Sequence, residues 1–194
     1  KFKNPVFHAI PMYYMFLCWI AGKEFIGTPQ GSEILVRPKK SRIYRFFAIK
    51  CLRAAKHITV DSVSMQEEIK SLCGRTATII QNGIDIDIII RNKPEKQERK
   101  LVVSPRGLSP LYRIEMIVDA RNKSIKKPYL HLIYPFYDEE YKNRITEKLI
   151  DGDIDLGRLT KDKMYKLLYM AKLVISVPIS DSSPRSVYEA IFCG

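Results

Sequence analysis

Apolar and polar positions along this chain fall into blocks that alternate between two periods. Short apolar runs, such as 57–62 and 101–105, are bounded by polar or turn residues and indicate buried strands. Longer segments between them place apolar residues three and four positions apart, which indicates amphipathic helices. The predicted strands are 5–10, 24–29, 57–62, 77–83, 101–105, 129–135, 153–157 and 172–180. The predicted helices are 12–22, 41–56, 64–74, 111–122, 138–150, 160–171 and 184–193.

Helix ends carry their own signals. Ser41 and Thr160 are predicted N-caps, because a hydroxyl there can accept a hydrogen bond from a free N–H group of the first turn. Ser64 followed by Glu67 is typical of a capping box, and Gly74 is typical of a helix end.

Strands that alternate with helices favour βαβ units and parallel sheets. The run 91–100 is entirely polar, densely charged and contains Pro94, so it predicts a linker. We therefore expect an α/β fold with two Rossmann-like lobes, residues 1–92 and 101–194, joined by 93–100. Ligands of such sheets bind beyond the carboxyl ends of the strands.

Composition narrows the class of partner. Hydrophobic residues make up 46% of the chain, enough for a packed core. The formal net charge of +12 favours binding to nucleic acid, anionic lipid or phosphorylated small molecules.

The four cysteines lack CxxC spacing, which argues against a zinc site and for a reducing compartment. The uncharged run 5–22 has a borderline length for a membrane span, but Pro5, His8 and Pro11 interrupt it, which favours a buried strand and helix.

The closing stretch 180–194, "SDSSPRSVYEAIFCG", combines a strand end with a helix start. Ser183 is a predicted N-cap and Pro184 a predicted first helical residue, so the free N–H groups of this turn form an anion site. Arg185 lies in the same turn, where a cation is disfavoured by about 0.3–1 kcal/mol unless an anion is bound in front of the helix. The alternative is an i,i+4 ion pair between Arg185 and Glu189.

Two acids flank this anion site. Asp181 follows the predicted strand and Glu189 lies inside the helix. Carboxylates repel phosphate but accept hydrogen bonds from vicinal hydroxyl groups, so they suit sugar rings on either side of a diphosphate. A nucleotide sugar is the ligand that matches this arrangement.

An acid, seven further residues, a Glu and then "AIFCG" resembles the donor-site motif of retaining GT-B glycosyltransferases of the GT4 (group 1) family. Other stretches resemble the same family in order and spacing. They are "ITVDSVSMQEEIKSLCG", "TIIQNGIDID", "LVVSPRGLSPLYRIEMIVDA", "LGRLTKDKMYKLLYMAKLVISVP" and the acceptor-side loop "TPQGSEILVRPKKS". Each match is weak by itself, but the ordered set covers nearly the whole chain.

The resemblance implies transfer of a hexose from a nucleoside diphosphate sugar to a glycan or glycolipid hydroxyl, in cell-surface polysaccharide synthesis and with retained anomeric configuration. It implies that Asp181 holds the donor sugar and Glu189 the ribose. The residues that it implies for the donor diphosphate are Arg106, Arg113, Ser183, Arg185 and Ser186. The residues that it implies for the acceptor side are Gln30, Gly31, Ser32 and Glu33.

The sequence departs from the family pattern at several positions. The first acid of the motif is Asp181 where the family usually has Glu, and "SSPRS" replaces the Gly-rich centre. Tyr112 stands where the family has a Lys, with Arg113 beside it, and Gln30 stands where many members have a His. Gln30 can donate a hydrogen bond but cannot act as a general base, so the leaving diphosphate would take the acceptor's proton.

No metal is expected, because arginines and a helix dipole would balance the negative charge of the diphosphate. The "DGDID" stretch at 151–155 is expected to be a turn rather than a metal-binding motif. Because the chain starts without Met and ends where a helix would stop, we expect a segment of a longer protein that can lack activity by itself.

The segment 37–56 suggests a further partner. Its cations share one helix face with Phe46 and Ile49, a mixture that suits an anionic membrane surface at the cytoplasmic face. The alternative is a solvated helix face. Two rival functions remain open, a basic nucleic-acid-binding module and a sugar-nucleotide-binding lobe without catalysis. No RNA- or DNA-binding motif supports the first of them.

Overall fold

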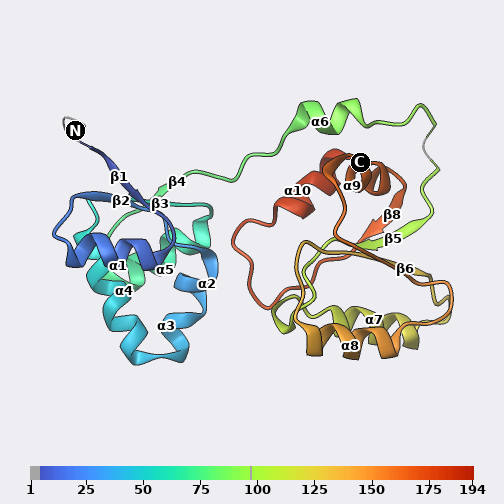
Figure 1. Cartoon of the computed structure of the whole chain (residues 1–194), viewed down its shortest axis with the longest axis horizontal. Coiled ribbons are helices and arrows are strands. Elements are labelled where there is room, and N and C mark those ends of the chain that lie inside the picture. The colour runs from blue at the N-terminus through green and yellow to red at the C-terminus, as the bar shows by residue number, and fades with distance from the viewer. Residues whose placement is uncertain (1–4, 97) are drawn as a thin grey trace. The chain divides into compact units, whose positions relative to one another are not determined.

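The computed structural model describes residues 5–96 and 98–194, and the chain divides into two compact units (Figure 1). The first unit runs to Asn82 and also includes Ser180–Ser183. The second unit comprises Gly83–Ile179 and Pro184–Gly194. In the described residues each unit contains a four-stranded sheet whose neighbouring strands are all parallel. The predicted architecture of two α/β lobes is therefore confirmed.

In the first unit the strand order is β1-β2-β3-β4. The strands are β1 (Phe7–Ala9), β2 (Phe25–Gly27), β3 (His57–Val60) and β4 (Thr78–Ile79). The helices are α1 (Met12–Ile20), α2 (Gly31–Leu35), α3 (Arg37–Lys40), α4 (Arg42–Ala54) and α5 (Val63–Cys73). Figure 1 shows these helices on one side of the sheet.

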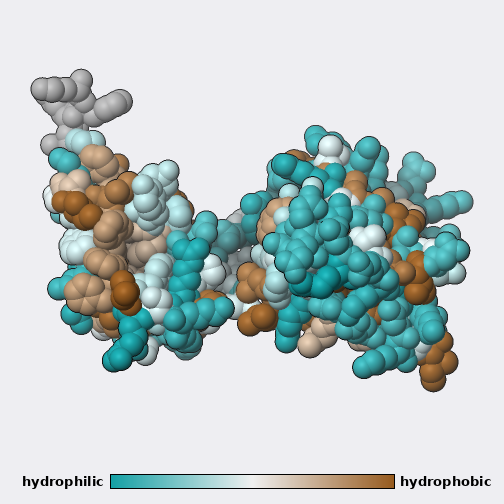
Figure 2. Space-filling model, turned by 60° about the horizontal axis from the view of Figure 1, so that its bottom comes forward, coloured by the Kyte–Doolittle hydropathy of each residue, from teal (hydrophilic) through white to brown (hydrophobic). Residues whose placement is uncertain are grey.

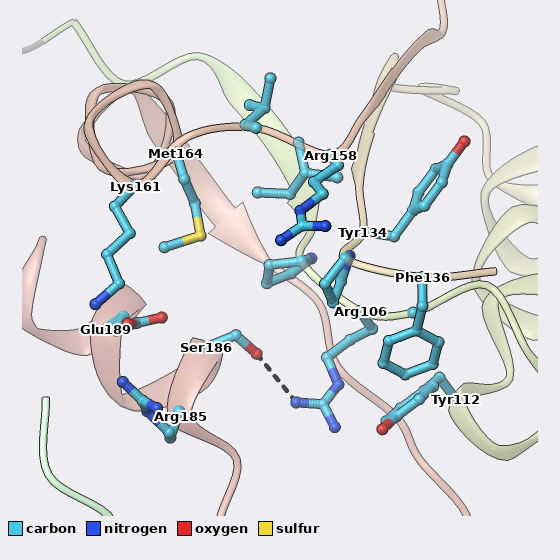
Figure 3. A pocket seen from close by; sticks show the side chains of 15 residues that line it. Arg106, Tyr112, Tyr134, Phe136, Arg158, Lys161, Met164, Arg185, Ser186 and Glu189 are labelled. Atoms are coloured by element: carbon cyan, nitrogen blue, oxygen red, sulfur yellow. Dashed lines mark hydrogen bonds between the residues drawn. The ribbon is translucent and has the colours of Figure 1, made fainter.

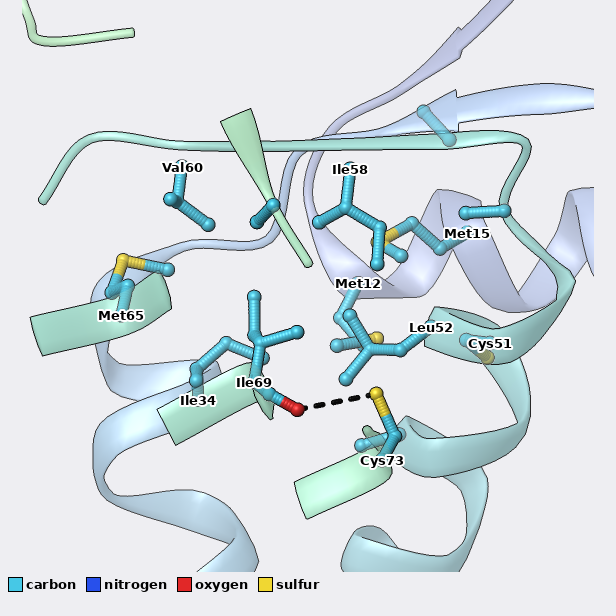
Figure 4. Packing of buried hydrophobic residues seen from close by; sticks show 14 of the residues in the cluster. Met12, Met15, Ile34, Cys51, Leu52, Ile58, Val60, Met65, Ile69 and Cys73 are labelled. Atoms are coloured by element: carbon cyan, nitrogen blue, oxygen red, sulfur yellow. Dashed lines mark hydrogen bonds between the residues drawn. The ribbon is translucent and has the colours of Figure 1, made fainter. Parts of the chain in front are cut away.

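The core of the first unit lies between that face of the sheet and the helices (Figure 4). Ile58 and Val60 point inward from β3, while His57 and Thr59 alternate with them and are more exposed. Met15, Leu52 and Ile69 bring α1, α4 and α5 into the same cluster. The apolar residues that recur at helical spacing in α1, α4 and α5 thus pack against one face of the sheet.

In the second unit the strand order is β7-β6-β5-β8. The strands are β5 (Leu101–Ser104), β6 (Leu130–Ile133), β7 (Ile154–Gly157) and β8 (Ala171–Val174). The helices are α6 (Ile86–Arg91), α7 (Ile114–Lys123), α8 (Glu139–Lys148), α9 (Lys161–Tyr169) and α10 (Arg185–Phe192), with a 3₁₀ turn at Pro110–Tyr112. Helices α7 and α8 cover one face of this sheet, and α6, α9 and α10 cover the other (Figure 1).

The polar run 93–100, which we expected to be a linker, lies inside the second unit. The helix before it, α6, is tied to α9 by hydrogen bonds and by an ion pair between Arg91 and Asp162 at 3.8 Å. The Tyr169 hydroxyl donates to the carbonyl of Ile89 at 3.1 Å, and the Asn92 amide donates to the Asp162 carboxylate at 2.7 Å. The expected first domain, 1–92, therefore extends past Asn82, where the first unit gives way to the second.

Some helix caps agree with the predictions and others do not. Ser41 accepts a hydrogen bond from the Tyr44 N–H group at 3.2 Å, and Gly74 ends α5 with a φ of 75°. Helix α5, however, begins after Ser62, whose hydroxyl accepts from Met65 N–H, so the predicted cap at Ser64 is wrong. Helix α10 begins after Pro184 rather than Ser183, since the Pro184 carbonyl accepts the first helical hydrogen bond.

The last predicted strand, 172–180, is also shorter than expected. Strand β8 ends at Val174 and lies at the edge of the described sheet, paired with β5. Asp181 therefore does not directly follow a strand. Ile175 and Val177 lie beyond the end of β8 and pack against the α7–α8 core, and the Ile175 N–H group still donates to the Val103 carbonyl of β5 at 2.9 Å.

The four cysteines are free thiols, and burial raises the pKa of Cys51 and of Cys193 to about 11.

No helix in the described part of the chain is both long enough and apolar enough to cross a bilayer.

Candidate functional site

A cavity of about 430 Å³ opens at the carboxyl ends of the strands in the second unit (Figure 3). Arg106 and Gly107 follow β5, and Tyr134 and Phe136 follow β6. The other walls come from the β7–α9 segment and the start of α10, through Arg158, Leu159, Lys161, Met164, Arg185, Ser186 and Glu189. This is the position where parallel α/β sheets bind ligands.

The charge of the cavity wall is mainly positive. Arg106, Arg158, Lys161 and Arg185 line it, against the single carboxylate of Glu189. The backbone N–H groups of Arg185 and Ser186 also precede the first intrahelical donor of α10, Val187. They carry the partial positive charge of a helix N-terminus. The cavity can therefore hold an anion that bears more than one negative charge.

Arg106 is held in place by its neighbours. It is 7% exposed, its Nη1 donates to the Ser186 hydroxyl at 3.0 Å, and its guanidinium lies 4.5 Å from the centre of the Tyr112 ring. Tyr112, at the position where the resemblance implies a Lys, thus supports the arginine by a cation–π contact. Ser186 links Arg106 to the first turn of α10 (Figure 3).

Glu189 is a buried carboxylate with a defined partner. It is 6% exposed, and the Tyr165 hydroxyl of α9 donates to its Oε1 at 2.9 Å. Burial, together with the nearby Glu189 charge, raises the pKa of Tyr165, so this hydroxyl keeps its proton. The alternative ion pair between Arg185 and Glu189 does not form among the described residues. Arg185 instead lines the cavity as an exposed cation.

Arg113 has a different position from the one we expected. Its Nε donates to the carbonyl of Val177 at 2.7 Å and its Nη2 to that of Pro178 at 3.4 Å. Its backbone has a φ of 50°, and its side chain is absent from the described cavity wall. Arg113 thus fixes the segment after β8, whereas Arg106 and Arg185 line the cavity.

The sequence analysis missed Arg158, Lys161 and Tyr165. Arg158 directly follows Gly157 at the end of β7, and Lys161 begins α9, so both lie where a parallel sheet presents its ligand site. That position was a usable signal. Tyr165 had none, because an aromatic residue at a helical spacing predicts core packing equally well.

The remaining predicted residues belong to the first unit. The segment Ser180–Ser183, which includes Asp181, packs there, with the Ser182 hydroxyl donating to Asp61 Oδ2 at 2.9 Å. A Cβ atom on Gly31 would lie 2.6 Å from Ser182 Oγ, so this close approach needs glycine. Asp181 itself is exposed and Ser183 is buried.

Glu33 was expected to face the acceptor, but the structure gives it a structural role. It is 4% exposed, and its Oε2 accepts hydrogen bonds from the backbone N–H groups of Met12 and Gln30, each at 2.9 Å. Gln30 is exposed at the start of α2, and Ser32 is half-buried. Of the four expected acceptor residues, Glu33 is therefore occupied inside the fold.

The "DGDID" turn also has a structural role. Asp153 forms a buried ion pair with Arg121, whose side chain is 3% exposed against 1% for the aspartate. Asp153 also accepts from the N–H groups of Leu130 at 2.8 Å and Ile150 at 2.9 Å. Its carboxylate is fully engaged inside the second unit.

Removing the Tyr165 hydroxyl tests whether it orients Glu189. The resemblance implies that Glu189 holds a ribose, and on that expectation Tyr165→Phe should weaken nucleoside diphosphate binding by about fivefold, the net value of roughly one hydrogen bond. The affinity for a 2′,3′-dideoxy analogue should stay unchanged, because Glu189 then has no ribose hydroxyl to bind. Calorimetric titration of both ligands measures the difference. An equal loss for both ligands would show that Tyr165 only supports the fold.

Comparison with known proteins shows where this arrangement recurs. No protein-family model matches the chain, and no curated protein matches it. Among solved structures, HepE from Anabaena in complex with UDP and glucose matches with a TM-score of 0.80 at 18% identity, covering 97% of this chain and 57% of HepE. A mutant of S. aureus TarM, in a complex that contains UDP, matches with a TM-score of 0.68 at 15% identity, covering 88% of this chain and 35% of TarM.

An α,α-trehalose 6-phosphate synthase from Burkholderia multivorans matches with a TM-score of 0.71 at 13% identity, covering 97% of this chain and 54% of the synthase. The chain thus spans little more than half the length of HepE and of the synthase. Across both units the chain has the two-lobed GT-B fold, as its sequence predicted.

Proposed function

We propose that this chain is part of a glycosyltransferase that moves a hexose from a nucleoside diphosphate sugar to a hydroxyl of a glycan or glycolipid. The observation that carries the proposal is the cavity of the second unit, where several cations and a helix N-terminus face one tethered carboxylate. HepE, which shares the fold, was solved with UDP and with UDP-glucose. The motif in 180–194 supports the same substrate class.

In this proposal the diphosphate binds to Arg106, Arg185, Ser186 and the first turn of α10. These groups stabilise the negative charge that develops as the bond to the sugar breaks, which is the largest electrostatic contribution in such a reaction. They are already oriented before the ligand arrives, because Ser186 holds Arg106 at 3.0 Å. The reaction then needs no metal, and the departing diphosphate accepts the proton of the attacking hydroxyl.

Glu189 binds the ribose in this proposal. Tyr165 occupies Oε1, so Oε2 is left to accept hydrogen bonds from ribose hydroxyls. Asp181 holds hydroxyl groups of the donor sugar, and Gln30, Gly31 and Ser32 face the acceptor. Retention of the anomeric configuration and a place in cell-surface polysaccharide synthesis follow from the resemblance to the GT4 enzymes.

Titration with UDP, GDP and ADP tests the proposal. At least one of them should bind with about 1:1 stoichiometry, and UDP is the first candidate because HepE and TarM were solved with it. Glu189→Ala should weaken this binding about tenfold, since it removes a charge-assisted hydrogen bond. Asp181→Ala should leave the affinity for the nucleoside diphosphate unchanged, because its expected partner is the sugar.

The two variants act as controls for each other, since each removes one carboxylate. If none of the three nucleotides binds, or if Glu189→Ala binds as tightly as the unaltered chain, the site assignment fails. On the full-length protein, Asp181→Ala should lower turnover with the nucleotide sugar. An unchanged rate would remove Asp181 from the donor site.

A further inference from the structure

Helices α1 and α4 of the first unit expose large hydrophobic side chains. Ile43 is 72% exposed and Ile20 is 64% exposed, although free isoleucine side chains favour burial. The exposed hydrophobic residues of the two helices are Tyr13, Tyr14, Leu17, Ile20, Ile43, Phe46 and Phe47. We refer to these residues as the α1–α4 face. Figure 2 shows hydrophobic surface gathered on this unit beside strongly hydrophilic surface.

Aromatic contacts join the two helices at this face. The Phe47 ring of α4 lies 5.5 Å from the Phe16 ring and 6.4 Å from the Trp19 ring, both on α1. It also lies 5.4 Å from the ring of Phe46. A hollow of about 410 Å³, lined by Tyr13, Phe16, Ile43 and Phe47 among others, opens between the helices. Tyr13, Ile43, Phe46 and Phe47 are therefore parts of one surface, and Leu17 and Ile20 follow Tyr13 along the same side of α1 at helical spacing.

Cations border the face along α3 and α4. Helix α1 carries no charged residue, and every charged residue between 37 and 56 is Lys or Arg. Some of these cations are neutralised inside the unit, as in the ion pairs Lys39–Glu68 at 3.1 Å and Lys56–Glu24 at 2.9 Å. Arg42, Arg45 and Lys50 have no carboxylate partner among the residues that the structure describes, and all three are exposed.

We propose that the α1–α4 face docks on the surface of an anionic lipid bilayer. Aromatic and aliphatic side chains would enter the boundary between headgroups and acyl chains, and the adjacent cations would attract the anionic headgroups. Lys50 shows the arrangement on a small scale, since its ammonium lies 5.6 Å from the centre of the Phe46 ring. Its stem can follow the apolar surface while its charge stays at the headgroups.

Two other occupants fit the face less well. A nucleic acid would use the cations but would leave Ile20, Ile43 and Leu17 in water, because a phosphate backbone offers them no apolar surface. A second copy of this chain, docked by the same face, would bring Arg42 and Arg45 toward an identical set of cations, which opposes association. A bilayer surface satisfies both the apolar and the charged part.

Vesicle co-sedimentation tests this inference independently of the nucleotide site. The chain should bind vesicles of phosphatidylcholine mixed with phosphatidylglycerol, and bind phosphatidylcholine alone at least tenfold more weakly. Arg42→Glu with Arg45→Glu should reduce binding to the mixed vesicles more than tenfold, since each basic residue near such a surface adds roughly a fivefold gain. Ile43→Ser with Phe46→Ser should reduce binding by a similar factor, because they remove the inserted groups.

The matched control is Lys123→Glu with Lys126→Glu, which changes the net charge equally on exposed residues of the second unit. It should bind the mixed vesicles within about twofold of the unaltered chain. A loss equal to that of Arg42→Glu with Arg45→Glu would show only a net-charge effect and overturn the inference.

The inference is also overturned if duplex DNA binds and vesicles do not. A dimer in light scattering that Ile43→Ser with Phe46→Ser converts to a monomer would assign the face to a second copy instead. Thermal melting followed by circular dichroism verifies that each variant is folded.

Discussion

Arg106→Ala is expected to weaken binding of UDP, or of the nucleoside diphosphate that the titration selects, by about 10- to 100-fold. The guanidinium is buried against Tyr112 and held by Ser186, so its hydrogen bonds are directed before the ligand binds. Charge-assisted hydrogen bonds to phosphate from such a position are worth about 1.5–3 kcal/mol. Binding of the nucleoside without phosphates, followed by ligand-detected NMR, should not change.

Arg144→Ala is the matched control. Arg144 is an exposed arginine of α8 that pairs with Glu140 at 2.8 Å, so its removal changes the net charge of the second unit equally. Its effect on nucleotide affinity should be less than about twofold, as expected for a surface charge. If Arg106→Ala weakens the nucleoside as much as the diphosphate, Arg106 supports the cavity wall and does not bind phosphate. In the full-length protein, Arg106→Ala should also lower turnover by about 10²–10³-fold.

Asp153→Ala is expected to destabilise the second unit by about 3–5 kcal/mol. The change leaves the Arg121 guanidinium buried and unpaired, and it removes the acceptor of the Leu130 and Ile150 N–H groups. Urea unfolding followed by circular dichroism measures the loss. The double change Asp153→Leu with Arg121→Met should recover much of the stability, because it removes both charges. If the single change costs less than about 1 kcal/mol, the pair is not buried as described.

The same pair predicts a dependence on pH. Burial tends to raise the pKa of Asp153, but hydrogen bonds from Arg121, Leu130 and Ile150 outweigh burial and hold the pKa below its usual value. A carboxyl with a lowered folded-state pKa contributes its full stability above its unfolded pKa, near 3.9, and loses the contribution as the pH falls through the folded value. The unaltered chain should therefore lose stability below about pH 4 more steeply than Asp153→Ala.

Part of this molecule could be read from its sequence. The alternation of apolar periods predicted the strands and most helices. Residues that face a shared core recur at every second position in a strand and about every 3.6 positions in a helix. The alternation missed α2, α3 and α6, which are too short to show a helical period. It also extended the last strand to 180, since Ile175 and Val177 are apolar for a reason that strands share, contact with a core.

The candidate site could be predicted only in part, for a related reason. Arg106, Arg185, Ser186 and Glu189 were expected and do lie together. Arg113 was expected with them, yet it is bonded to two carbonyls. One-dimensional spacing places an arginine near the end of a strand but does not determine which way its side chain turns. Glu33 shows the same limit, because a carboxylate beside a loop can cap the backbone as readily as it can bind a sugar.

Glu33 also has a mechanical consequence. A single oxygen of its carboxylate accepts hydrogen bonds from the N–H group of Met12, the first residue of α1, and from that of Gln30, the N-cap of α2 at the end of the loop after β2. If α1 shifts when it meets a lipid surface, this oxygen cannot keep both hydrogen bonds without moving the loop as well. Contact with a membrane and the shape of the expected acceptor entrance would then change together, through one atom.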